Sequence, residues 1–299
     1  MLKVENVRKK YGDLVAVNNL SFEVADGEIF GLLGLNGAGK TTTFRMIMNL
    51  LDDYEGTILL DNEKVSYKTT DKIGFLTEER SLLTKLTVLE QVIYYGVLKG
   101  MPEDKIEKEL DYWLDIFKIK EYKNKKIKEL SKGNQQKIQF ITAIIHHPKL
   151  LILDEPFSGL DPVNVELFKS VILKLKQEGT SIIFSSHRME HVELFCEKLV
   201  VLVKGKSVLS GYLKDIKNEY RQKNVHVIGD IDISKIEKLD YVKEIETIND
   251  EYIIKITDNS YTNELFKEIS KYKNITKFIV EEPSLNEIFI SKVGEAYEE

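Results

Sequence analysis

The chain contains one cysteine, Cys196, among its 299 residues. A single cysteine cannot form a disulfide within the chain, and this scarcity is typical of proteins in a reducing compartment. Long apolar runs are also missing, since stretches such as residues 29–35 and 199–203 are far too short to cross a bilayer. The first ten residues have no apolar core of the kind found in a signal peptide. We therefore expect a cytoplasmic protein, and any membrane span that it works with must belong to another chain.

An excess of basic residues is absent as well. The chain has 43 Lys and Arg against 49 Asp and Glu, which gives a net charge of −6. A protein whose main partner is nucleic acid usually presents a basic face, so the charge balance argues against such a partner. Hydrophobic residues make up 42% of the chain and charged residues 31%, as in ordinary globular proteins. The length allows one large domain and a small one.

The pattern of apolar residues predicts an α/β domain at the start of the chain. Half-buried strands are expected at residues 2–7 and 20–24, and a continuously apolar strand at residues 28–33 runs into a glycine-rich turn and a helix. Helical patterns at about residues 86–147 interrupt the alternation of strands and helices, which predicts a helical subdomain. Further buried strands are expected at residues 150–153, 181–185 and 199–203.

The composition changes near residue 216. Residues 216–223 are charged and lose the apolar rhythm, so we expect a linker there, between a large domain at residues 1–215 and a small domain at residues 223–299. Ser284 and Glu287 form a capping box that starts a last helix. The small domain is expected to be α+β, with strands at residues 225–228, 242–248, 252–256 and 276–280 and a helix around residues 265–269.

The stretch GLNGAGKT, Gly34–Thr41, matches the phosphate-loop pattern G-x-x-x-x-G-K-[ST] in full. Its glycines let backbone N–H groups converge on phosphate oxygens, and the following helix points its N-terminus at the same place. Lys40 is expected to reach the β- and γ-phosphates of a nucleotide, and the Thr41 hydroxyl to take a position on Mg²⁺. A strand before the loop and a helix after it argue against a chance glycine turn.

Four further residues are candidates for the chemistry of that site. In LLILDEP, Leu150–Pro156, a buried strand should deliver Asp154 beside the phosphate loop as a Mg²⁺ ligand, and Glu155 as general base for an attacking water. Tyr11 could stack on adenine, although a tyrosine at such a place can also be structural. His187 ends an apolar strand and could bridge the γ-phosphate and the attacking water, whereas a lone histidine there is often structural.

A second anion-binding element appears at LSKGNQQK, Leu130–Lys137, which reads as a helix start. The phosphate loop, this stretch, LDEP and His187 follow one another in an order and spacing that resembles the nucleotide-binding subunits of ABC transporters, over about the first 215 residues. The resemblance implies an ABC-type ATPase fold with a mixed sheet core and a helical subdomain. It also implies that two subunits dimerise head to tail, so that Ser131 and the Gly133 N–H contact the γ-phosphate held by the other copy.

The resemblance further implies a partner and a location. A polytopic membrane permease would bind the ATPase at the inner face of the membrane, and Glu78–Lys85 would transmit closure to it. Three stretches resemble NatA-like sodium exporters and related drug exporters more narrowly: FRMIMNLL, LTEER at residues 76–80, and the ending EEPSLNEIFISKVG. The expected ligands of ATP are Tyr11, Gly34, Leu35, Asn36, Gly37, Ala38, Gly39, Lys40, Thr41, Thr42, Ser131, Gly133 and Asn134. Those of Mg²⁺ are Thr41, Glu78 and Asp154, and the catalytic residues are Glu155, His187 and Lys40.

Three departures from the family pattern leave alternatives open. Glu78 stands where a glutamine is usual, Thr77 stands where a proline is usual before it, and the signature reads LSKGN with Lys132 in place of glycine. Such changes are compatible with a nucleotide-gated module that does not hydrolyse ATP. A soluble ABC ATPase acting on ribosomes or DNA is the other alternative, but the chain has one ATPase set and no sustained heptads between the phosphate loop and the signature.

Overall fold

The computed structural model describes residues 1–79, 81–220 and 222–298, and the chain divides into two compact units, Met1–Ser210 and Gly211–Glu299. The expected linker at residues 216–223 is wrong for the most part. A helix, α7 (Leu213–Glu219), occupies the segment, and its Ile216 is buried. The charged residues around Ile216 form the solvated side of this helix, which is why the segment reads as a linker. Arg221 lies outside the described residues.

A six-stranded sheet forms the centre of the first unit, in the order β10-β9-β3-β8-β7-β6. From β9 to β6 all neighbouring strands are parallel. Three of them, β3, β7 and β8, are buried along their whole length, as is usual for parallel strands that are covered on both faces. The strands are β3 (Ile29–Gly34), β6 (Ile73–Leu76), β7 (Leu150–Asp154), β8 (Ser181–Ser185), β9 (Lys198–Val203) and β10 (Lys206–Tyr212).

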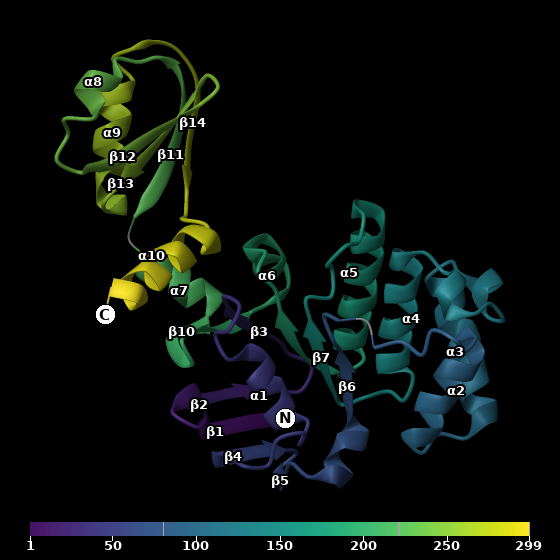
Figure 1. The fold of residues 1–299 in the computed structure, drawn as a ribbon. Coiled ribbons are helices and arrows are strands. Elements are labelled where there is room, and N and C mark those ends of the chain that lie inside the picture. The colour runs from purple at the N-terminus through teal and green to yellow at the C-terminus, as the bar shows by residue number, and fades with distance from the viewer. Residues whose placement is uncertain (80, 221, 299) are drawn as a thin grey trace. The chain divides into compact units, whose positions relative to one another are not determined.

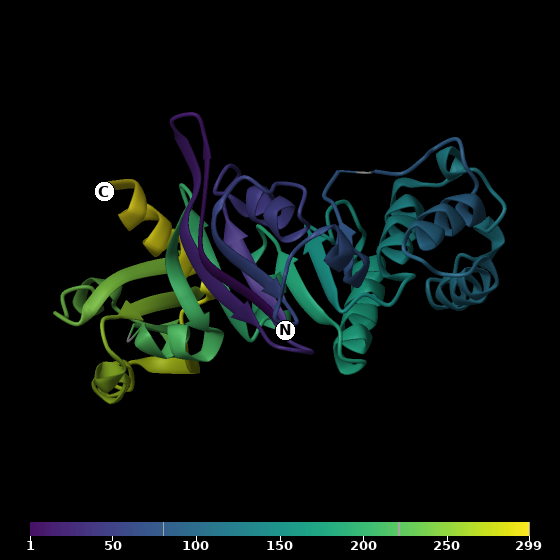
Figure 2. The same cartoon turned by 90° about the horizontal axis from the view of Figure 1, so that it is seen from below.

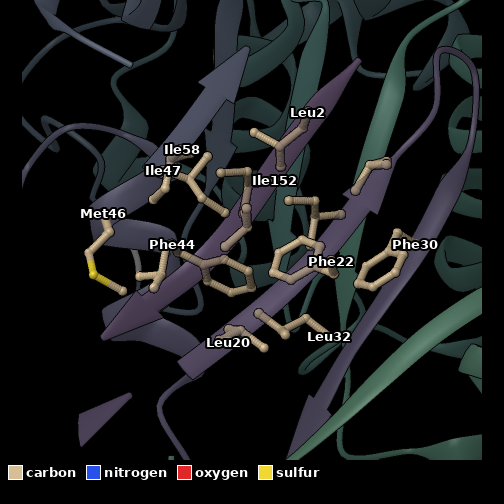
Figure 3. Packing of buried hydrophobic residues seen from close by; sticks show 14 of the residues in the cluster. Leu2, Leu20, Phe22, Phe30, Leu32, Phe44, Met46, Ile47, Ile58 and Ile152 are labelled. Carbon is tan, nitrogen blue, oxygen red and sulfur yellow. The ribbon is translucent and has the colours of Figure 1, made fainter. Parts of the chain in front are cut away.

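A second, antiparallel sheet packs against this one in the order β2-β1-β4-β5. Its strands are β1 (Leu2–Tyr11), β2 (Leu14–Val24), β4 (Glu55–Leu60) and β5 (Glu63–Lys64), and Figure 2 shows β1 and β2 as a long purple hairpin. Alternate residues of β1 and β2 are buried, among them Leu2 and Leu20. They meet Phe30 and Phe44 in the core between the sheets (Figure 3). This packing fixes the loop that joins β3 to α1.

Helices of the first unit pack beside the parallel sheet or on one another. They are α1 (Lys40–Ile47), α2 (Val88–Leu98), α3 (Glu103–Ile116), α4 (Lys132–Ile144), α5 (Pro162–Gln177) and α6 (Met189–Phe195). Helices α2, α3 and α4 form the helical part that the sequence predicts, and α4 lies between β6 and the α2–α3 pair (Figure 1). Trp113 is buried in α3. Among the described residues, no helix combines the length and the apolarity that are needed to cross a membrane.

The second unit is an α+β domain, as predicted. Its antiparallel sheet has the order β12-β13-β11-β14. The elements are β11 (Lys223–Asp230), α8 (Ile233–Ile236), β12 (Val242–Ile248), β13 (Glu251–Ile256), α9 (Thr262–Ile269), β14 (Lys273–Glu281) and α10 (Leu285–Glu298). One face of the sheet packs on α9 through residues such as Val225, Ile254 and Leu265. The predicted capping box is present, because the Glu287 N–H donates to Ser284 Oγ at 3.2 Å and the Ser284 N–H to Glu287 Oε2 at 2.8 Å.

Candidate active site

The carboxyl ends of four of the parallel strands meet around one cavity of about 610 Å³. Residues at or just beyond the ends of β6, β7, β3 and β9 line it, namely Glu78, Asp154, Leu35 and Lys204. The edge formed by strand carboxyl ends is where open α/β sheets bind ligands. The full lining is Tyr11, Leu14, Val15, Ala16, Leu35, Asn36, Gly37, Ala38, Gly39, Lys40, Thr41, Thr42, Glu78, Asp154, Glu155 and Lys204.

The predicted phosphate loop forms one wall of the cavity. Gly39 caps α1 with φ at 109°, and a Cβ at this position would come 2.5 Å from the Ala16 carbonyl oxygen. Only glycine therefore allows the loop to lie this close to β2. Lys40 Nζ donates to the Gly34 carbonyl at 2.7 Å and to the Leu35 carbonyl at 3.3 Å. The loop thus gathers a lysine cation and the N-terminus of α1 at one place, which suits a phosphate group.

Asp154 lies at the end of β7 and is 7% exposed. Burial raises its pKa above the ordinary value of 3.8, and the nearby carboxylates of Glu78 and Glu155 act in the same direction. The Ser185 hydroxyl donates to Asp154 Oδ1 at 2.6 Å and, with the Lys40 cation, opposes that shift. The balance disfavours a negative charge on Asp154. A cation bound beside this carboxylate would stabilise its charged form.

The oxygen donors here fit a magnesium ion. Thr41, Glu78 and Asp154 line the same cavity and offer one hydroxyl and two carboxylates. Mg²⁺ prefers oxygen ligands and usually takes only one or two protein carboxylates, with water and phosphate oxygens completing its shell. Within the described residues, no group of three or more His, Cys, Asp and Glu side chains is arranged to hold a metal. This donor set therefore suits an ion that arrives with a phosphate ligand.

Glu155 has a backbone conformation that residues other than glycine rarely adopt. Its φ is 50°, in the left-handed region, and its N–H donates to the Ser185 carbonyl at 3.2 Å. Its Oε2 atom lies 2.9 Å from His187 Nδ1 and accepts from Ser186 Oγ at 3.4 Å. Strained residues that neighbouring bonds hold in place are frequent at active sites. The carboxylate is thus directed to the cavity and supported by two side chains from the segment after β8.

Tyr11 ends β1 beside the cavity, and its side chain is 44% exposed. Lys9 Nζ lies over one face of the Tyr11 ring, 5.1 Å from its centroid, as in a cation–π contact. Leu14, Val15 and Ala16 follow on β2 and line the same part of the cavity. The aromatic ring and the small apolar residues form a surface on which a flat heterocycle can stack.

The signature stretch lies elsewhere in the chain. Ser131 caps α4, and its hydroxyl oxygen accepts from the Asn134 N–H at 3.3 Å. Lys132 is the first residue of α4 and is not among the residues with positive φ, so it replaces the usual glycine without backbone strain. None of the residues of this stretch lines the phosphate-loop cavity, and this holds for the predicted ligands Ser131, Gly133 and Asn134. Within one chain, the structure does not bring the two predicted anion sites together.

Some residues of the site escaped the sequence prediction. Lys204 begins a turn after β9, and the Gly205 N–H in that turn donates to the Ala38 carbonyl at 3.0 Å. Ser185 and Ser186, which support the two carboxylates, were also missed. The available signal was the polar residue after each buried strand, because parallel strands that are neighbours end at the same edge. Of the predicted residues, Gly34 and His187 lie next to the cavity without lining it.

Comparisons with known proteins agree with this geometry. A family model described as "ABC transporter" matches residues 17–158, and a model described as "ATP-binding protein DrrA1-3-like, C-terminal domain" matches residues 211–293. The uncharacterized ABC transporter ATP-binding protein YhaQ of Bacillus subtilis (strain 168) is 50% identical over 298 residues, which cover 100% of both chains.

Two further relatives, like YhaQ, come from Bacillus subtilis (strain 168). The linearmycin resistance ATP-binding protein LnrL is 30% identical over 306 residues, with 98% of each chain covered. The ABC transporter ATP-binding protein NatA is 34% identical over 217 residues, which are 71% of this chain and 88% of NatA. Among solved structures, the dimeric structure of the bacterial ABC transporter cassette MJ0796 matches with a TM-score of 0.65 and 28% identity, over 71% of this chain and 99% of that one.

Proposed function

The chain belongs to the ATP-binding subunits of ABC transporters, whose members hydrolyse ATP, and we propose that it drives an exporter as one half of a head-to-tail dimer. The observation that carries this proposal is the cavity at the sheet edge, where the phosphate loop, Asp154 and Glu155 face the same space. The arrangement argues against a binding module that does not hydrolyse ATP, because Glu155 is both strained and supported by His187.

Hydrolysis follows from the roles of four side chains. The loop N–H groups and Lys40 bind the β- and γ-phosphates, and the Tyr11 ring stacks on the adenine. Glu155 accepts a proton from the water that attacks the γ-phosphorus, and His187 orients the carboxylate through their 2.9 Å contact. The bond from the γ-phosphorus to the bridging oxygen breaks, and the products are ADP and phosphate. Thr41, Glu78 and Asp154 would hold Mg²⁺, which neutralises phosphate charge when bound.

The dimer supplies what one chain lacks. Because Ser131 and the N-terminus of α4 are remote from the cavity of their own chain, the anion that they bind comes from a second copy. We propose that Ser131 and the Gly133 N–H donate to the γ-phosphate held by the partner's phosphate loop. A group supplied in trans in this way accelerates phosphoryl transfer by roughly 10³–10⁵ where an arginine serves that purpose. The dimeric form of the similar MJ0796 cassette supports this assembly.

A second cavity is the proposed contact with the permease. It has a volume of about 360 Å³ and is lined by residues of α2 and α4, by the segment around Ser81 and Leu82, and by residues 48–50 after α1. Two apolar side chains at its rim are strongly exposed, Leu50 (66%) and Tyr67 (84%). A largely apolar hollow with exposed apolar residues beside it is typical of a surface that binds a partner segment. Arg80, which belongs to the predicted transmitting segment, lies outside the described residues.

Export of a drug-like compound is the transport direction that the comparisons favour. LnrL is named for resistance to linearmycin, and the match covers 98% of this chain. The match of residues 211–293 to a DrrA1-3-like C-terminal domain extends the similarity to the second unit. The similarity to NatA covers the ATPase part, 71% of this chain. We therefore place the chain with exporters that remove a compound from the cell.

Copurification tests the proposal. The chain is expressed with a tag together with each polytopic membrane protein encoded beside its gene, and membranes are solubilised in mild detergent. A permease should copurify with the chain, and the complex should hydrolyse ATP faster when the transported compound is added. A Tyr67→Asp variant, which places a charge at the rim of the second cavity, should lose the permease but keep ATP binding. A chain that hydrolyses ATP and binds no membrane protein would instead be a soluble ABC ATPase.

A further inference from the structure

A glutamine in the middle of α4 holds both sides of Glu78. Gln139 is 4% exposed, and its Nε2 atom lies 3.1 Å from the Thr77 carbonyl oxygen, 2.9 Å from Thr77 Oγ1 and 3.1 Å from the Glu79 carbonyl oxygen. Carbonyl oxygens only accept, so the amide group of Gln139 is the donor in these contacts. A single side chain therefore holds the backbone carbonyls of the two residues that flank Glu78.

The loop itself reinforces this arrangement. Thr77 Oγ1 and the Glu79 carbonyl oxygen both accept from Gln139. The Thr77 hydroxyl also donates a hydrogen bond to that carbonyl. The usual proline has no hydroxyl and could not make this bond. Thr77 and Gln139 thus form a local polar network around Glu78, whose own side chain lines the phosphate-loop cavity.

Two other amides fasten α4 in the same manner. Gln135 Nε2 donates to the carbonyls of Ile127 and Leu130, which precede the signature, at 3.1 Å and 3.2 Å. Gln136 Nε2 donates at 3.4 Å to the carbonyl of Pro156, one residue beyond Glu155. The amides of this helix therefore contact the backbone beside Glu78, beside Glu155 and before the signature residue Ser131. A rigid helix tied in this way moves these loops together.

We propose that Gln139 is a positioning residue that couples the two half-sites of one chain. Ser131 at the start of α4 meets ATP held by the partner, and Gln139 lies eight residues later, about 12 Å along the helix axis. A displacement of α4 on closure therefore moves Glu78 in the chain's own cavity. This inference rests on the proposed dimeric ATPase. It implies that the position of Glu78, which stands where a glutamine is usual, depends on the position of α4.

The test measures how the ATPase of the full-length chain depends on Mg²⁺. Gln139→Leu keeps the size of the side chain and removes its donors, so the Mg²⁺ concentration for half-maximal activity should rise about 3–10-fold. ATP binding in the absence of Mg²⁺ should stay within twofold of wild type. Thr77→Val removes one of the three contacts and should shift the same quantity less. Thr180→Val is the matched control, because Thr180 is buried and its hydroxyl donates to the Pro148 carbonyl, away from Glu78.

A double-mutant cycle separates positioning from a general structural effect. In a Glu78→Ala background, Gln139→Leu should leave the Mg²⁺ dependence unchanged, because its effect acts through Glu78. An equal shift in both backgrounds overturns the proposal, and so does a wild-type Mg²⁺ dependence in Gln139→Leu. A wild-type chain that neither binds nor hydrolyses ATP would instead contradict the proposed function. These outcomes differ, so failure of the inference can be told from failure of the function.

Discussion

Nδ1 of His187 lies 2.9 Å from Oε2 of Glu155, and the two side chains differ sharply in exposure. The carboxylate is 9% exposed, whereas the imidazole is 66% exposed. Glu155 is therefore fixed by the protein, while His187 is open to a ligand that enters the cavity. This asymmetry fits a base that is held in place and a partner that can change its contacts when a phosphate group binds.

Replacing Glu155 by Gln should abolish most turnover. The amide cannot accept the proton of the attacking water, so the ATPase rate should fall by about 10²–10⁴. The variant should still bind ATP and should form a dimer with it, which light scattering would detect. Glu190→Gln, in the nearby first turn of α6, is the control and should behave as wild type. A rate above a tenth of wild type in Glu155→Gln would remove Glu155 from the role of general base.

Two inactive variants should complement each other. Lys40→Ala damages the phosphate loop and Ser131→Arg damages the signature, so a mixed dimer contains one site in which both halves are intact. Random pairing of equal amounts should restore roughly a quarter of the wild-type sites. Mixing Lys40→Ala with Glu155→Gln should restore none, because both changes lie in the same half-site. The ATPase rate of the mixtures measures this, and no recovery in the first mixture would contradict head-to-tail assembly.

Lys204 should contribute to nucleotide affinity. Its side chain lines the cavity beside the phosphate loop, so loss of its charge in Lys204→Gln should weaken ATP binding about 2–5-fold at low salt. The difference should shrink as the salt concentration rises, since the lysine is exposed and its field is screened. Lys206→Gln, at the start of β10 and outside the cavity lining, is the matched control. Calorimetric titration with ATP would measure both, and equal affinities would contradict the prediction.

His146 should make stability depend on pH. Burial lowers its pKa from 6.5 to about 4, with the Lys99 cation acting in the same direction. Between pH 6.5 and about 4 the unfolded chain therefore binds a proton that the folded chain does not, and stability falls as the pH falls. The loss should reach on the order of 3 kcal/mol.

A substitution isolates this effect. His146→Gln removes the titrating group, so its free energy of unfolding should vary less between pH 7 and pH 4.5 than that of wild type. His147→Gln is the control, because its imidazole is 57% exposed. Urea unfolding at the two pH values measures the difference. A wild-type pH dependence in His146→Gln would show that other groups cause the loss.

The phosphate loop, the Asp154–Glu155 pair and the capping residue Ser131 could be predicted because each depends on consecutive residues. A strand, a glycine-rich turn and a helix start are all encoded locally, and the structure has β3, Gly39 and α1 where the pattern requires them. The α+β character of the second unit was accessible for the same reason. Local patterns also explain why Lys132 could be assigned to a helix start before its φ was known.

The remaining features depend on contacts between distant segments. Lys204 joins the site because β9 pairs with β3. The residues around Lys204 do not indicate which strand β9 pairs with. The network around Gln139 unites residues that are 60 and more positions apart. Ile216 was assigned to a linker because one apolar residue among charges shows no period, yet it is buried in the structure. Pairing and burial of this kind follow from the whole fold.

The left-handed backbone of Glu155 has a consequence for the evolution of the chain. A glycine at this position would relieve the backbone and should make the folded protein more stable, while it removes the base. Selection for stability and selection for turnover therefore oppose each other at one residue. Relatives that have given up hydrolysis would be expected to lose this side chain early. The identity of residue 155 is thus a simple marker of whether a descendant of this protein still hydrolyses ATP.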